Sequence, residues 1–407
     1  MQKSTRIVIC AALGATALAA LPSLAQRAPT SGPVARYDMR AGTLSDFGAM
    51  GGGMGMMFGG GGNKVQHELY LRLGSSRGPD KGGPKADHFM PPSAKLGKSV
   101  ALVTPTLEKQ PMDEFPGERP RGRLLIFWGC GEHAPKGQPV VIDFAKIAAG
   151  QMPAGIWSST VIRDWGPSQT NSKTFGRWPA EDGKYAKADT SLPGPHRVAG
   201  NYSPEMSFTL AKDFMAPLRT RNAEQASGAA LLSWGAVAEA TGYLATLFGG
   251  RMSPDGKMGD MVMWTSSAGR QFGGGLGDWL SPGQVATLVK ERTVMPPATT
   301  SCLVPAEVRK AAPDFRMGTL TAFGPQEDFS FPPRPADPKA AWNLEWTARI
   351  RHRSTTTWMD MPGMGDMGGM SGMSERDDDD ARAQPQQNCK PKGGLGGLVR
   401  GVLKPGC

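Results

Sequence analysis

The stretch that decides the fold is ALLSWGAVAEATGYLATLF, residues 230–248, with GDMVMWTSS following at residues 259–267. A short apolar run ends in Trp234, a Val-x-x-Ala-Thr-Gly turn follows, and Tyr243 opens a second apolar run. Short runs of strand-forming residues separated by turn residues are typical of consecutive β-strands. This part of the chain therefore predicts three successive strands.

This strand, turn and strand resemble the B and C strands of fibronectin type III-like domains. In that family the matching tryptophan and tyrosine, here Trp234 and Tyr243, pack between two sheets. The resemblance covers residues 229–267 and implies a β-sandwich over residues 221–358, completed by strands in SCLVP, RMGTLTAFG and NLEWTARIRHRSTTTW. The chain is also similar to uncharacterised exported bacterial proteins that carry WGCGE and AGNYSPEM, which implies no activity.

Strand patterns also precede this segment. In HELYLRL, Leu69, Leu71 and Leu73 alternate with larger polar residues, as in a strand with one buried face. GRLLIFWGC, PVVIDF and SVALVTPTL are further short runs bounded by Pro and Gly. We therefore predict a mainly β protein with two β-sandwich-like domains, an N-terminal β domain at 64–220 and the fibronectin type III-like domain at 221–358.

One short helix is predicted inside the second domain, at residues 282–291. Ser281 is a favourable N-cap residue, Pro282 suits the first helical turn, and Gln284 completes a capping box. The apolar face of this helix consists of Val285, Leu288 and Val289.

The first 25 residues have the pattern of a secretory signal peptide. Lys3 and Arg6 precede an apolar run, and a small-residue cleavage site ends near Ala25. We expect a mature protein in the periplasm or outside the cell. Its formal net charge would fall from +10 to +8, because cleavage removes two positive residues. This charge is compatible with anionic surfaces, whereas export and scattered basic residues argue against nucleic acid as a partner.

Three flanking segments are predicted to lie outside the globular domains. Residues 26–63 are rich in Gly and Met, and residues 359–388 combine Met, Gly and an acidic run. Both compositions are typical of disorder. Residues 389–407 form a basic tail bracketed by cysteines, in which residues 393–404 could form an amphipathic helix on a membrane or a disulfide-closed loop.

The methionine-rich segments suggest a site for a soft metal. Thioether sulfur is a neutral ligand suited to Cu(I), and a Gly-rich chain can wrap several such ligands around one ion. These segments resemble those of periplasmic copper-resistance proteins but contain no histidine, which leaves Cu(I) as the cofactor to consider. The alternative is a linker with methionine as neutral filler. The candidate ligands are Met50, Met54, Met56, Met57, Met361, Met364, Met367, Met370 and Met373.

The mature chain keeps four cysteines, which allow three disulfide connectivities in an oxidising compartment. Cys389 and Cys407 bracket a short tail, so a local bond between them is the simplest expectation. Cys130 and Cys302 would then join two distant segments.

No catalytic residues are predicted. GSSRG at 74–78 matches a nucleophile-elbow pattern around Ser76, but the Pro and Gly residues after it favour a turn over the required helix. The five histidines are scattered and show no metal-binding spacing. Paired carboxylates beside surface tryptophans, as in a carbohydrate-binding or carbohydrate-active protein, stay open because the fold alone would bring them together.

The sequence thus favours an exported, non-catalytic envelope protein that acts as a binding or structural module. The expected partner is an envelope protein or a cell-surface polymer. A periplasmic Cu(I)- or Ag(I)-binding protein is the first alternative, and a carbohydrate-binding or carbohydrate-active protein is the second.

Overall fold

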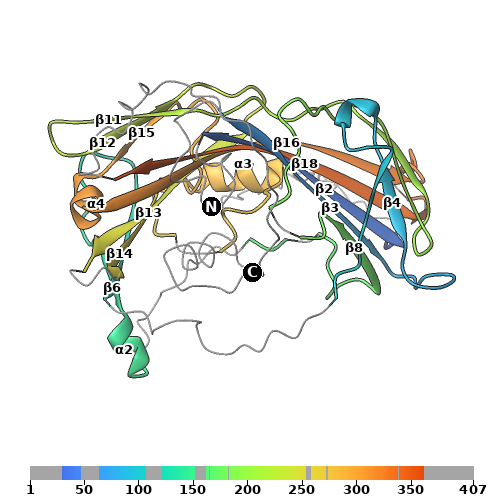
Figure 1. Cartoon of the computed structure of the whole chain (residues 1–407), viewed down its shortest axis with the longest axis horizontal. Helices are drawn as coiled ribbons and strands as arrows, with labels where there is room; N and C mark the ends of the chain where they lie inside the picture. The colour runs from blue at the N-terminus through green and yellow to red at the C-terminus, as the bar shows by residue number, and fades with distance from the viewer. Residues whose placement is uncertain are drawn as a thin grey trace, which may run out of the picture.

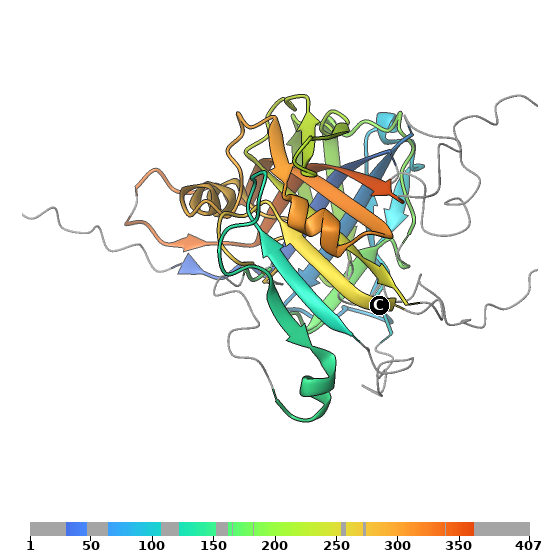
Figure 2. The same ribbon diagram turned by 90° about the vertical axis from the view of Figure 1, so that its left-hand side faces the viewer.

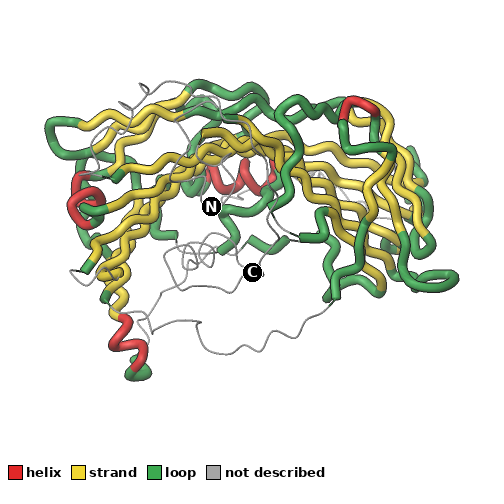
Figure 3. The backbone as a smooth tube through the Cα atoms, in the orientation of Figure 1, coloured by secondary structure: helices red, strands yellow, loops and turns green. Residues whose placement is uncertain are grey.

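The computed structural model describes residues 30–46, 64–106, 122–151, 162–164, 166–181, 183–253, 258–271, 274–337 and 339–361. The protein is mainly β, with 45% of it in strands and 8% in helices, as the sequence predicted. Figure 3 shows this predominance of strands along the backbone.

A nine-stranded sheet is the centre of the fold, and it curves like an arch in Figure 1. Its neighbours are antiparallel except for two parallel pairs, β6 with β14 and β2 with β18. In spatial order the strands are β7 (Val140–Asp143), β6 (Arg123–Trp128), β14 (Met258–Thr265), β13 (Gly242–Met252), β16 (Phe315–Phe331), β18 (Trp346–Asp360), β2 (Ala35–Asp46), β3 (Val65–Ser75) and β8 (Thr174–Trp178).

Two smaller sheets cover the outside of the arch (Figure 1). One consists of β10 (Met206–Leu210), β9 (Gly194–Gly200), β4 (Ala86–Phe89) and β5 (Ser99–Ala101), and the other of β11 (Thr220–Glu224), β12 (Ala230–Trp234) and β15 (Ser301–Val304). Each packs on the central sheet through its own apolar cluster.

Helix α3 (Pro282–Lys290) lies under the arch, on the face that we call the inner face (Figure 1). The shorter elements are β1 (Thr30–Ser31), which pairs with β17 (Trp342–Asn343), the 3-10 turn η2 (Pro92–Ala94), α2 (Phe144–Ala148) and α4 (Ala306–Ala311). Figure 2 shows α2 projecting beyond the end of β7. None of the helices in the described part of the chain is long and apolar enough to cross a membrane.

Local sequence patterns predicted several of these elements correctly. Leu69, Leu71 and Leu73 of β3 are all buried in the core shared with β4, β9 and β10. The predicted helix is α3, where the Ser281 hydroxyl accepts from the Gln284 amide and the Gln284 side chain accepts from the Ser281 amide.

The predicted tryptophan–tyrosine contact also forms. Trp234 of β12 and Tyr243 of β13 lie in different sheets, and their ring centroids are 5.5 Å apart. The Tyr243 hydroxyl accepts a hydrogen bond from the Val237 amide, 2.9 Å away, which fixes the turn between the two strands.

Residues 35–46 contradict the prediction of disorder for residues 26–63. They form β2, an interior strand of the nine-stranded sheet, with Tyr37, Met39 and Ala41 buried. The Gly and Met content of the whole 26–63 window concealed an alternating pattern in its first half.

The predicted boundary between residues 220 and 221 does not separate two sheets. Strands from both sides of it interleave in the nine-stranded sheet, because β14 pairs with β6 and β18 pairs with β2. Parallel pairs join distant segments, and no local pattern in the sequence specifies which strands will meet.

Candidate functional site

Charged side chains gather on the inner face where β18, β2 and β3 lie side by side. Directly paired residues project to the same face of a sheet, so Arg349, Asp38 and Arg72 form one row across the three strands. Phe323 of β16 pairs with Arg353 and packs in the apolar cluster around α3, which identifies this face as the inner one. The arginine cluster, as we call it, comprises Asp38, Arg40, Arg72, Asp164, Arg349 and Arg351.

Asp38 is the centre of the arginine cluster, and its side chain is only 1% exposed. It accepts hydrogen bonds from Nε of Arg40 at 2.8 Å, from Nε of Arg349 at 3.0 Å and from Nη2 of Arg351 at 2.9 Å. Burial alone would raise the pKa of Asp38, but the three guanidinium charges outweigh it and hold this pKa below its ordinary value. Asp38 is therefore a structural anion that fixes the directions of three arginines.

Asp164 supplies the second carboxylate from the connection that precedes β8. It pairs with Arg40 and lies 3.4 Å from both Arg72 Nη1 and Arg351 Nη2. The Gly166 amide donates to its Oδ1, the oxygen that also faces Arg351, at 3.0 Å. Burial raises the pKa of Asp164, but the arginine charges and the Gly166 hydrogen bond lower it more strongly. Asp164 thus stays ionised with the arginines.

Two glycines allow this connection to lie directly on the sheet. A Cβ atom at Gly74 of β3 would come within 2.2 Å of Ser172 Oγ and 2.6 Å of Pro167 Cβ. A Cβ atom at Gly166 would come within 3.3 Å of Arg40 Nη2. A larger residue at Gly74 would push the connection off the sheet, whereas one at Gly166 would require the neighbouring side chains to shift by only a few tenths of an ångström.

The arginine cluster holds four guanidinium groups and two carboxylates, so its formal charge is +2. Burial, followed by the charges of neighbouring arginines, lowers the pKa of both Arg72 and Arg351. Arg353, next along β18, is balanced separately by Glu68, whose Oε1 lies 2.7 Å from its Nη2. The uncompensated charge suits the arginine cluster to binding an anion.

A second polar group is buried between the central sheet and the β4–β9–β10 layer. The Tyr37 hydroxyl lies 2.6 Å from His88 Nδ1, and His88 Nε2 lies 2.9 Å from His196 Nδ1. His196 Nε2 lies 2.8 Å from the Leu192 carbonyl oxygen, which can only accept. His196 must donate there, so His88 donates to His196 and Tyr37 donates to His88. In this histidine chain, which links Tyr37, His88 and His196, every hydrogen bond then has one donor and one acceptor while both imidazole rings stay neutral.

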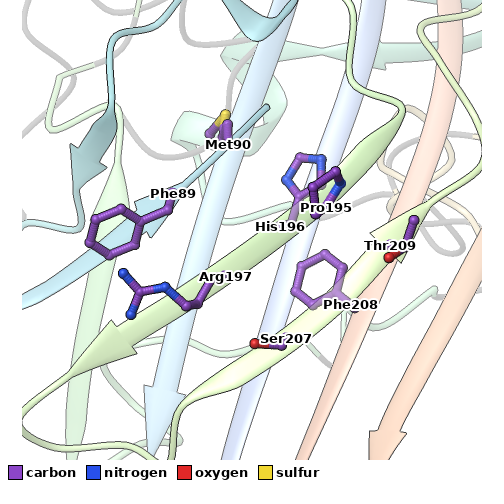
Figure 4. Close-up of a pocket in the computed structure, with 8 residues that line it drawn as sticks. All are labelled: Phe89, Met90, Pro195, His196, Arg197, Ser207, Phe208 and Thr209. Atoms are coloured by element: carbon purple, nitrogen blue, oxygen red, sulfur yellow. The ribbon is translucent and has the colours of Figure 1, made fainter. Parts of the chain in front are cut away.

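A hollow of about 410 Å³ lies on the solvent side of the same layer (Figure 4). Ser207 and Thr209 are exposed around the buried Phe208, which places the hollow on the outer face of β10. The Arg197 guanidinium lies 3.9 Å from the centre of the Phe89 ring and forms an ion pair with Glu205. Because Glu205 already balances the charge of Arg197, the hollow offers no excess positive charge for an anion.

The structure places some of the residues singled out in the sequence. Cys130 and Cys302 are disulfide-bonded, as predicted, with Cα atoms 5.2 Å apart. Met361 follows β18 and is exposed, and Ser76 donates to the Val34 carbonyl. The other candidate residues lie outside the described part of the chain: Met50, Met54, Met56, Met57, Met364, Met367, Met370, Met373, Cys389 and Cys407.

The arginine cluster was not predicted from the sequence. The signal was present in β18, where Arg349, Arg351 and Arg353 alternate at a period of two with residues such as Ala348 and Ile350 that pack on the opposite face. A basic residue at every second position of one strand predicts a charged face. Asp38 and Asp164 could not be predicted as partners of these arginines, because they lie far away in the sequence. Asp38 is 313 positions from Arg351, and Asp164 is 187 positions from it.

Comparison with protein-family models, with curated proteins and with solved structures finds no match to this chain. Its function has to be inferred from the chemistry of its own residues.

Proposed function

We propose that the protein is an exported, non-catalytic binding module of the cell envelope, and that the arginine cluster is its ligand-binding surface. The signal-peptide pattern before Ala25 supports export. The disulfide between Cys130 and Cys302 is consistent with an oxidising compartment. The expected ligand is an anionic group of a cell-surface polymer or envelope protein.

The observation that carries the proposal is the excess charge of the arginine cluster. Arg40 and Arg351 are almost fully buried and both pair with Asp38 and Asp164, so the excess positive charge falls on the partly exposed Arg72 and Arg349. Asp38 and Asp164 compensate only half of the four arginine charges. An anionic ligand would supply the rest, and the positive charge of the whole chain would favour its approach.

We also propose that residues 229–267 form a fibronectin type III-like unit within the larger fold. The contact between Trp234 and Tyr243, with their strands in different sheets, supports this relationship. Such units commonly present binding surfaces on a rigid β scaffold.

Binding to immobilised polymers tests the main proposal. We expect the purified mature protein to bind polyphosphate or poly-L-glutamate and not neutral dextran, and we expect R72Q/R349Q to weaken this binding at least tenfold. The matched control is R123Q/R197Q, which removes two exposed arginines elsewhere on the surface. Equal weakening by both double variants would contradict a specific site, and binding to dextran would favour the carbohydrate alternative.

Copper binding by the methionine-rich segments is the alternative proposal. It is supported by two separate methionine-rich runs in the sequence. Titration with Cu(I) against a competing chelator would test it: deletion of residues 362–373 should reduce the number of bound ions, and an unchanged stoichiometry would count against those ligands.

A further inference from the structure

Two arginines of the cluster have hydrogen-bond donors that no residue in the described part of the chain accepts. The Arg72 and Arg349 side chains are 34% and 27% exposed, whereas Arg40 and Arg351 are 6% and 4% exposed. A guanidinium group carries five N–H donors. Within the described residues, Arg72 uses one of them, toward Asp164 at 3.4 Å.

Among the residues that the structure describes, none occupies the outer end of Arg349. Its Nε is occupied by Asp38 at 3.0 Å, but its Nη2 lies 3.9 Å from Asp164, beyond hydrogen-bond distance. The terminal nitrogens of Arg349 and Arg72 therefore remain able to donate to a ligand.

The two arginines are also placed to act on the same ligand. Both are paired in register with Asp38, one from β18 and one from β3, on the inner face. Adjacent strands are about 4.8 Å apart, so the two backbones are separated by roughly 10 Å. Two arginine side chains can reach a single small group across that distance, beside Asp164, which lies 3.4 Å from Arg72 Nη1 and 3.9 Å from Arg349 Nη2.

From this geometry we infer that the arginine cluster binds a phosphate monoester group. The inference rests on the proposed function and adds the chemical class of the ligand. A monoester carries close to two negative charges at neutral pH and three terminal oxygens, which matches the formal charge of +2 and two guanidinium forks. A carboxylate has only two oxygens and one charge, and Asp164 already provides one such group.

A phosphate monoester group occurs in soluble esters and also in lipid headgroups of the phosphatidic acid type. Both present the same terminal group, so the arginine cluster alone does not choose between them. Titrations with glycerol 3-phosphate and with phosphatidylcholine vesicles containing 10% phosphatidic acid separate the two sources. Affinity for the soluble ester alone would assign a soluble ligand, and much tighter vesicle binding would assign the headgroup.

Isothermal titration of the mature full-length protein tests the inference. We expect glycerol 3-phosphate and inorganic sulfate, a dianion of similar shape, to bind. Dimethyl phosphate and acetate, which carry one charge, should bind at least tenfold more weakly. R72Q/R349Q should lower the affinity for the monoester at least tenfold, and R123Q/R197Q should leave it within twofold.

The variant R72K distinguishes a loss of ligand binding from a loss of folding. It keeps the charge but removes the planar fork, so we expect a native thermal midpoint with an intermediate affinity. Equal affinities for glycerol 3-phosphate and dimethyl phosphate, or no effect of R72Q/R349Q, would overturn the inference. If the anionic polymers bind through the cluster and the small monoester does not, the inference fails while the proposed function stands. If neither binds, both fail.

Discussion

Asp38 shows how a single residue can organise a charged site inside a β fold. Its carboxylate receives hydrogen bonds from three arginines of two different strands. A buried ion pair gains little over a well-packed apolar pair, but removing one partner leaves the other charge uncompensated. The other five charged groups of the arginine cluster therefore depend on Asp38 more than an exposed residue depends on its partner in a surface ion pair.

Replacing Asp38 tests this dependence. We expect D38N to lower the free energy of unfolding by about 3–5 kcal/mol, because it leaves three guanidinium groups with one carboxylate fewer. The matched control is D260N, which breaks the more exposed pair with Arg123. Urea unfolding of both variants should show a much smaller loss for D260N, and losses of equal size would contradict the assignment of Asp38 as the centre of the arginine cluster.

The histidine chain makes a prediction about pH. Burial lowers the pKa of His88 well below its ordinary value and also lowers that of His196. The unfolded state therefore takes up protons at a higher pH than the folded state does. The free energy of unfolding should be highest above about pH 6.5 and should fall as the pH drops below it.

Urea unfolding between pH 7 and pH 5 checks this prediction. H88Q/H196Q removes both titrating groups, so we expect it to show a shallower loss of stability over this range than the wild type. H133Q, which replaces an exposed histidine beside Glu307, serves as the control. A wild-type slope unchanged by H88Q/H196Q would mean that other groups control the pH dependence.

Among the elements, α3 shows a helix end set by a few local residues. The capping box at Ser281 and Gln284 satisfies backbone amides that the first turn leaves free. Val285 and Leu288 then anchor the helix on the inner face. The helix lies next to the segment that touches the arginines, since the Trp279 carbonyl accepts from Arg351.

Removing the cap should have a measurable effect. We expect S281A to lower the free energy of unfolding by about 1 kcal/mol, because the Gln284 amide loses its side-chain acceptor. S281D, which keeps an acceptor, should restore most of the stability. Chemical unfolding measures both variants, and equal losses would show that the capping hydrogen bond contributes little.

Strands and helices with complete local signals were predictable from the sequence, and their pairing was not. The alternation of leucines in β3 and the capping box of α3 each lie within about ten residues. By contrast, the pairing of β2 with β18 joins residues more than 300 positions apart. The arginine cluster depends on that pairing. The alternation of its arginines could be recognised within one strand, but the aspartates that pair with them come from distant segments and could not be identified.

At the scale of the whole molecule, the disulfide joins two layers. Cys130 follows β6 of the nine-stranded sheet, and Cys302 lies in β15 of the outer three-stranded sheet. The two cysteines are 172 residues apart in the sequence. A crosslink over such a distance restricts the unfolded chain strongly.

Breaking this crosslink should destabilise the protein substantially. The chain-entropy relation gives a loss of about 5 kcal/mol for C130S/C302S. Thermal unfolding with and without reductant measures it: the wild type should lose stability on reduction and the double variant should not respond. A wild-type midpoint that reductant does not change would contradict a stabilising role.

The central claim is that the inner face binds anions through Arg72 and Arg349. The most direct measurement is the affinity for an anionic polymer as a function of NaCl concentration, for the wild type, R72Q/R349Q and R123Q/R197Q. Salt screens charge–charge attraction, so the wild type and R123Q/R197Q should bind tightly and lose affinity steeply with salt. R72Q/R349Q should bind at least tenfold more weakly, with a shallower salt dependence. Identical affinities and salt dependences for all three proteins would contradict the account.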